Sequence, residues 1–114
     1  MGRVIAESAA ASGRRVGLIA SADHGHAHDP TGPYGFDPAS AAYDGRIVEI
    51  VRENRLADLL DVAPDFVAAA QADSWWQMLV LHGATVGGFD VELLSYEAPT
   101  YFGMLCASFT PRAS

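Results

Sequence analysis

The segment Arg15–Ser21, "RVGLIAS", limits the possible folds of this 114-residue chain more than any other stretch. It is an apolar run that contains β-branched residues and shows no alternation with polar side chains. Strands of this kind are usually covered on both faces, as in sheets that carry helices on each side. The segment therefore predicts a strand in the middle of a sheet, and with it an α/β fold.

The rest of the chain predicts several helices followed by two strands. Asp37 and Pro38 form a strong helix start, with an N-cap carboxylate and a proline at the first helical position. Patterning predicts helices over residues 3–12, 38–53, 56–61, 64–71 and 74–84, and strands over 90–97 and 101–109. We expect one α/β domain spanning residues 1–114, with a mostly parallel or mixed central sheet flanked by helices. Because three strands make a small sheet, we expect it to be the C-terminal part of a larger domain.

The charge and cysteine content exclude several classes of protein. The net charge of −7 argues against nucleic acid or an anionic membrane as the main partner, because both require clustered basic residues. The single cysteine, Cys106, excludes a disulfide framework. The N-terminal residues do not have the pattern of a signal peptide, and no apolar run is long enough to span a bilayer. We therefore expect a cytoplasmic protein.

Three histidines follow the predicted strand in the sequence "DHGHAH", at positions 24, 26 and 28. In extended backbone this spacing places their side chains on one face. Neutral imidazoles are common ligands of zinc, iron and copper, so one interpretation is a metal site. A closed zinc site is less favoured, because such sites take four ligands and no cysteine pair lies nearby.

Two other interpretations of the histidines remain open. Ligands of open α/β sheets bind at the carboxyl ends of the strands, where a histidine oriented by Asp23 or Asp29 can act as an acid or base. Alternatively, the segment is a polar loop whose histidines are all hydrogen-bonded. Tyr34 and Phe36 either form the wall of an aromatic pocket or fold the loop onto the domain.

Three motifs resemble a known family when taken in order. They are "LIASADHGHAHDPTGPYGFDPASAAYDGRIVEIV", "WWQMLVLHGAT" and "ELLSYEAPTYFGMLCASF". Together they resemble the second half of the class III extradiol ring-cleavage dioxygenase superfamily, over roughly residues 13–110. That superfamily includes the catalytic (B) subunit of protocatechuate 4,5-dioxygenase and the related Memo proteins.

The resemblance implies a non-haem Fe(II) site of two histidines and one carboxylate, at which O2 opens a catecholic ring. His26 matches the family's acid–base histidine, and Asp23 is its neighbour. Glu97, in "SYEAP", matches the carboxylate ligand. His24 and His28 are expected to line the substrate pocket together with Tyr34. The implied partners are a catecholic substrate and O2.

This chain departs from the family at the two iron-binding histidines. In the family they precede the segment that carries the acid–base histidine, which has the pattern "DxSH". Here no histidine precedes His24. We therefore expect a truncated chain, a first half that is a separate polypeptide, or a site that has been lost. The alternative functions are a non-catalytic, Memo-like module that binds a metal or peptide, and an inactive remnant. An unpaired sheet edge would favour a homo-oligomer or pairing with an N-terminal half.

Overall fold

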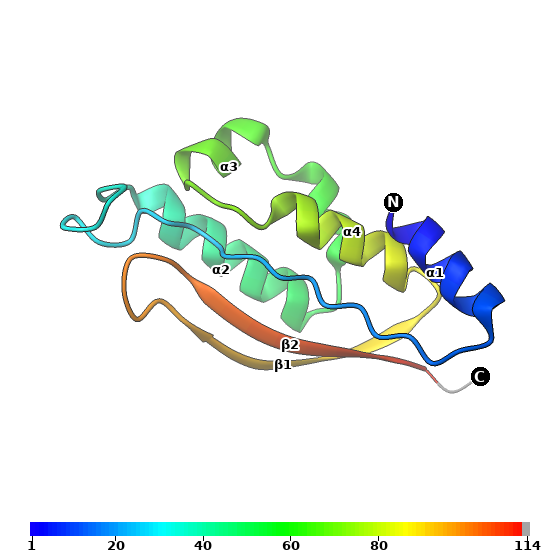
Figure 1. The fold of residues 1–114 in the computed structure, drawn as a ribbon. Helices are drawn as coiled ribbons and strands as arrows, with labels where there is room; N and C mark the ends of the chain where they lie inside the picture. The colour runs from blue at the N-terminus through cyan, green and yellow to red at the C-terminus, as the bar shows by residue number, and fades with distance from the viewer. Residues whose placement is uncertain (113–114) are drawn as a thin grey trace.

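A computed structural model describes residues 1–112 of the chain as a layer of helices packed on a β-hairpin (Figure 1). The helices cover one face of the hairpin, and an extended segment after α1 runs lengthwise along the side of the molecule that faces the viewer. In chain order the elements are α1 (Gly2–Ser12), α2 (Pro38–Arg52), the 3-10 helix η1 (Leu56–Asp61), α3 (Pro64–Ala69), α4 (Trp75–Thr85), β1 (Phe89–Glu97) and β2 (Met104–Pro111).

Helix α2 carries the centre of the hydrophobic core. It begins as predicted, with Oδ1 of the N-cap Asp37 accepting a hydrogen bond from the Ala39 N–H at 2.9 Å. Its inward face buries Tyr43, Ile47 and Ile50 completely. Apolar side chains from η1, α4 and the hairpin complete the cluster, including Leu59, Met78, Leu81, Val91, Leu105 and Phe109. Burial of this amphipathic face is what holds helices and hairpin together.

The sheet within residues 1–112 is the antiparallel pair β1–β2, in register from Phe89 opposite Pro111 to Glu97 opposite Met104. An irregularity in the pairing lies between Leu93 and Ser95. Alternate residues of each strand face the helices, and the others face solvent. The two strands predicted at the C-terminal end of the chain are confirmed, although the second begins three residues later than expected.

The prediction of a buried central strand at Arg15–Ser21 is wrong. The segment is extended but belongs to no sheet, and Val16 and Ile19 are 57% and 88% exposed. An apolar run becomes a buried strand only if neighbouring strands pair with its backbone. No such strand lies beside these residues within the described part of the chain. The mixed α/β class is confirmed, but the sheet observed is antiparallel rather than parallel or mixed.

The predicted helices are confirmed, with small shifts at their ends. Helix α1 stops at Gly13, whose φ of 68° is the left-handed conformation that glycine adopts without strain. It packs against α4, where Gly2 lies so close to the backbone that a methyl group would overlap Val80 O. Within residues 1–112, no helix has the length and apolar character required to cross a membrane.

Candidate functional site

The histidine segment, residues 23–28, is held by other loops on both of its edges. On one edge the His24 N–H donates to Gly103 O at 3.0 Å. On the other edge the His26 N–H donates to Ala70 O at 3.1 Å. The segment therefore lies between the loop that joins β1 to β2 and the turn that follows α3.

The three imidazoles do not form a common site, because each bonds to a different element. Nδ1 of His24 lies 2.8 Å from Ser74 Oγ, at the start of α4. His26 bonds to the turn after α3, and His28 to Asp44 of α2. The expectation that extended backbone aligns the three rings holds only for a regular strand. The chemistry of each histidine must therefore be considered separately.

His26 has a defined tautomer and an available nitrogen. Its Nδ1 lies 2.7 Å from the Gln71 carbonyl oxygen, which can only accept, so Nδ1–H is the donor. In the neutral ring Nε2 then carries the lone pair. Asp23 Oδ2 lies 3.7 Å from Nε2, and 14% of the His26 side chain is exposed. The predicted pairing of His26 with Asp23 is thus present as a longer-range electrostatic contact.

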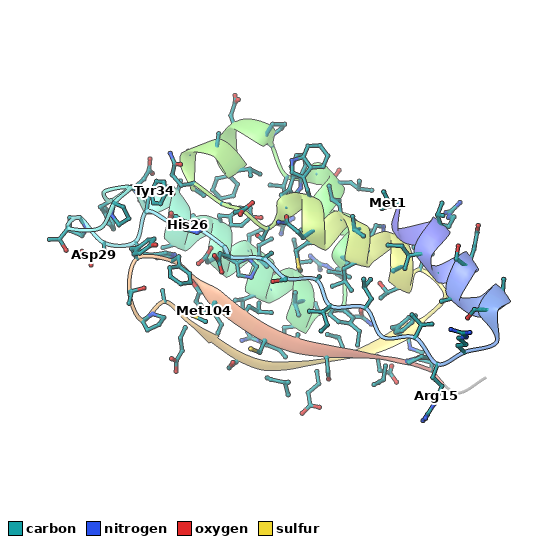
Figure 2. The ribbon with its side chains drawn as sticks, in the orientation of Figure 1. Met1, Arg15, His26, Asp29, Tyr34 and Met104 are labelled. Atoms are coloured by element: carbon teal, nitrogen blue, oxygen red, sulfur yellow. The ribbon has the colours of Figure 1, made fainter. Side chains whose placement is uncertain are left out.

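Aromatic side chains surround the His26 ring. The Phe102 ring is stacked on it with centroids 5.6 Å apart, and Tyr34 meets it edge-on at 5.6 Å. Tyr101 lies 6.1 Å away. Figure 2 shows His26 and Tyr34 together at the end of the molecule that carries the projecting loop, far from Met1 and Arg15.

His26 and Tyr34 line a surface cavity of about 650 Å³. Its other walls come from α3, the turn after it and the start of α4. Trp75 is fixed there because its Nε1–H donates to Leu59 O at 2.8 Å, whereas Trp76 is 72% exposed. A volume of this size accommodates a small aromatic molecule.

His24 belongs to the interior of the protein. It is 3% exposed, and Ser74 Oγ connects it to the Tyr43 hydroxyl through a further contact of 2.9 Å. Burial lowers the pKa of His24 below its usual value of 6.5, although the nearby carboxylates of Asp44 and Asp23 oppose this shift. Its ring lines a different cavity, of about 450 Å³, bounded by residues 18–22 and β2.

His28 takes part in a hydrogen-bonded cluster around the buried carboxylate of Asp44. His28 Nε2 lies 2.8 Å from Asp44 Oδ2, and the Tyr96 hydroxyl donates to the same oxygen. The Gly25 N–H donates to Oδ1 at 2.8 Å. Burial, the hydrogen bond to Asp44 and that residue's charge together raise the pKa of Tyr96. This cluster connects the histidine segment to α2 and β1, so its position suits a structural role.

Glu97 lies at the exposed end of β1, opposite Met104. Its carboxylate has no hydrogen bond or ion pair to the histidines among the contacts of the described residues. Across residues 1–112, no group of three or more histidine, cysteine, aspartate or glutamate side chains is placed to hold a metal ion. The donors that an iron centre requires are therefore not gathered by this part of the chain.

Sequence reasoning missed the partners of the histidines. Gln71, Ser74 and Asp44 lie 45, 50 and 16 residues from the histidines that they contact. In the structure, Gln71 adopts a φ of 51° and turns the chain after α3. No sequence motif marks that position.

Comparison with known proteins found no match, either among protein-family models or among curated proteins. The resemblance to extradiol dioxygenases therefore rests on the three sequence motifs alone.

Proposed function

We propose that this chain binds a catecholic ring in the cavity beside His26 and contributes the acid–base histidine of an extradiol ring-cleavage site. The observation that supports this most is the state of the His26 ring. Its Nδ1–H is bonded to Gln71 O at 2.7 Å, so the neutral ring retains a lone pair on Nε2. The same ring lines a cavity with aromatic walls.

In this proposal Nε2 accepts the proton of a catechol hydroxyl. The imidazolium that forms is stabilised by Asp23, whose Oδ2 lies 3.7 Å from Nε2. Gln71 O continues to accept from Nδ1–H and holds the ring in place during the transfer. Tyr34 and Trp75 provide flat surfaces against which the substrate ring can pack. His26 later returns the proton to the product, as a general acid.

Ferrous iron, when bound, supplies the chemistry that activates O2 in sites of this class. The described residues do not complete such a centre, since His24 and His28 are engaged by Ser74 and Asp44, and Glu97 alone cannot hold the metal. We therefore assign only proton transfer to this chain. The two remaining histidine ligands would come from another polypeptide, with Glu97 as the proposed carboxylate.

The segment Arg15–Ser21 supports pairing with another chain. It is extended and apolar, and the backbone groups of residues 15–22 form no backbone–backbone hydrogen bond with any other residue of the range 1–112. We propose that it becomes an inner strand of a mostly parallel or mixed sheet when a strand of a second polypeptide, or of a second copy, lies beside it. Sedimentation equilibrium would detect a second copy as a rise in mass with concentration.

The acid–base role is tested with 4-nitrocatechol, whose visible spectrum changes when a hydroxyl ionises. The wild-type chain should bind it and shift its spectrum towards the anion. His26→Gln should still bind but lose the shift, because the amide is not a base at neutral pH. His82→Gln, on α4 and away from the cavity, is the control. An equal shift in His26→Gln would exclude the proposed role.

A second candidate is a binding module without turnover, in the manner proposed for Memo-like proteins. It is favoured by the absence of a metal-holding group within residues 1–112. Oxygen uptake separates the two functions. Fe(II) and a catechol, given to the chain together with a polypeptide that supplies the two histidine ligands, should consume O2 if the first proposal is correct. Catechol binding without O2 uptake under those conditions would support the module.

A further inference from the structure

We infer that the cavity beside His26 selects aromatic ligands with a cationic ammonium substituent over ligands with a carboxylate. This inference rests on the proposed function, because it specifies the substrate class of the same cavity. It follows from two features that the acid–base role does not require, namely exposed aromatic faces and carboxylates at or near a lining that holds no arginine.

The first feature is a group of aromatic side chains open to solvent. Trp75 and Trp76 lie with ring centroids 5.1 Å apart, and Trp76 is 72% exposed. Tyr34, on the opposite loop, is 55% exposed. Exposed aromatic rings that line one cavity are the usual elements of sites for organic cations, because their faces carry negative potential. Trp has the strongest such face.

The second feature is the sign of the charged groups. Asp73 lines the cavity, and a backbone bridge joins it to Asp23, whose Oδ2 lies 3.7 Å from Nε2 of His26. The lining contains no arginine, and His26 is its one side chain that can become positive. A carboxylate on the ligand would therefore meet carboxylates, whereas an ammonium group would be attracted to them.

The arginine nearest in sequence to the lining, Arg55, is engaged in ion pairs. Arg55 forms ion pairs with Glu53 and Asp58, each with a nitrogen–oxygen distance of 2.9 Å. The chain as a whole carries a net charge of −7, which adds to the preference for cations.

Tryptophan fluorescence provides a direct readout, since the chain has two tryptophans and both line the cavity. The intact chain is titrated with three catechols: unsubstituted catechol, 3,4-dihydroxybenzoate and 4-(2-aminoethyl)catechol. Phenyltrimethylammonium, which has no hydroxyl group, is the fourth probe. We expect the aminoethyl compound to bind roughly tenfold more tightly than catechol, and the benzoate to bind more weakly than catechol.

Two variants test the source of the preference. Asp73→Asn keeps the shape of the side chain and removes its charge, so the ratio of aminoethylcatechol to catechol affinity should fall about threefold. Trp76→Leu should weaken the binding of phenyltrimethylammonium by about tenfold, and the fluorescence of Trp75 still reports that binding. Glu92→Gln, on the exposed face of β1, is the matched charge control. It should change neither the ratio of the two catechol affinities nor the affinity for phenyltrimethylammonium.

The outcomes distinguish this inference from the proposed function. Equal affinity for all three catechols would overturn the cation preference but would remain consistent with the proposed catechol site. Binding of phenyltrimethylammonium but of no catechol would support a site for cations and contradict the proposed function. Tighter binding of the benzoate than of the amine would overturn the inference directly.

Discussion

At the scale of single residues, the histidines are distinguished by their partners rather than by their spacing. The sequence pointed to His26 and Asp23, and the structure places Asp23 Oδ2 3.7 Å from Nε2 of His26, a residue that lines a cavity. The sequence did not reveal that Ser74 forms a hydrogen bond with His24, or that Asp44 forms one with His28. Those contacts join parts of the chain that are distant in sequence, and hydrophobic patterning carries no information about them.

His24 should make the stability of the protein depend on pH. Its pKa in the folded chain is lowered from 6.5 by burial, so below that pH the unfolded chain binds a proton that the folded chain does not. Stability should therefore fall as the pH drops through 6.5. Urea unfolding at about pH 7.5 and about pH 5.5 measures the change.

His24→Gln is the comparison for that pH effect. It should lower stability by roughly 1–3 kcal/mol at neutral pH, because Ser74 loses one of its two partners and the packing changes. The remaining loss of stability on acidification should be smaller than in wild type. An unchanged pH dependence in His24→Gln would show that another group is responsible.

Gly103 should tolerate no side chain. A methyl group there would overlap Asp44 Oδ2 and lie 2.9 Å from the Tyr96 hydroxyl, both in the cluster that holds His28. We expect Gly103→Ala to cost at least about 2 kcal/mol in the free energy of unfolding. Gly45→Ala is the matched control, because it faces open space within α2 and should stabilise the helix by about 0.5–1 kcal/mol. Similar effects of the two substitutions in chemical denaturation would contradict the close packing described here.

At the scale of elements, local signals predicted the helices well and the sheet poorly. Asp37 and Pro38 define the start of α2, and Gly13 the end of α1, because capping depends on neighbouring residues. The segment Arg15–Ser21 has the composition of an inner strand but lacks neighbours in the described chain. Strand pairing depends on segments distant in sequence, so composition alone could not establish it.

The unpaired state of that segment leads to a prediction for hydrogen exchange. Amides of Val16, Leu18 and Ile19 should exchange within about tenfold of the rate in an unstructured peptide, since none donates to the backbone. Amides of Ile47 and Ile50, in the buried face of α2, should exchange at least about a thousandfold more slowly. Strong protection of residues 16–19 that persists on dilution would contradict the unpaired arrangement. Protection that appears only at high concentration would indicate pairing between copies.

At the scale of the whole molecule, the fold brings three separate segments to one end. The histidine segment lies between the turn after α3 and the loop after β1, and hydrogen bonds on both edges hold it there. The projecting loop carries Tyr34 to the same end (Figure 2). The order of the elements did not predict that these segments meet. The hydrogen bonds that hold them together come from irregular loops, not from paired strands.

The central claim is that His26 meets an aromatic ligand through Nε2, and NMR of the histidine side-chain nitrogens tests it most directly. The chain has four histidines, and single substitutions assign each one. On titration with catechol, we predict a saturable, one-to-one change in the Nε2 signal of His26, while the nitrogens of buried His24 and of His82 keep their signals. A His26 signal that does not respond while catechol binds, or equal responses at all four histidines, would contradict the account.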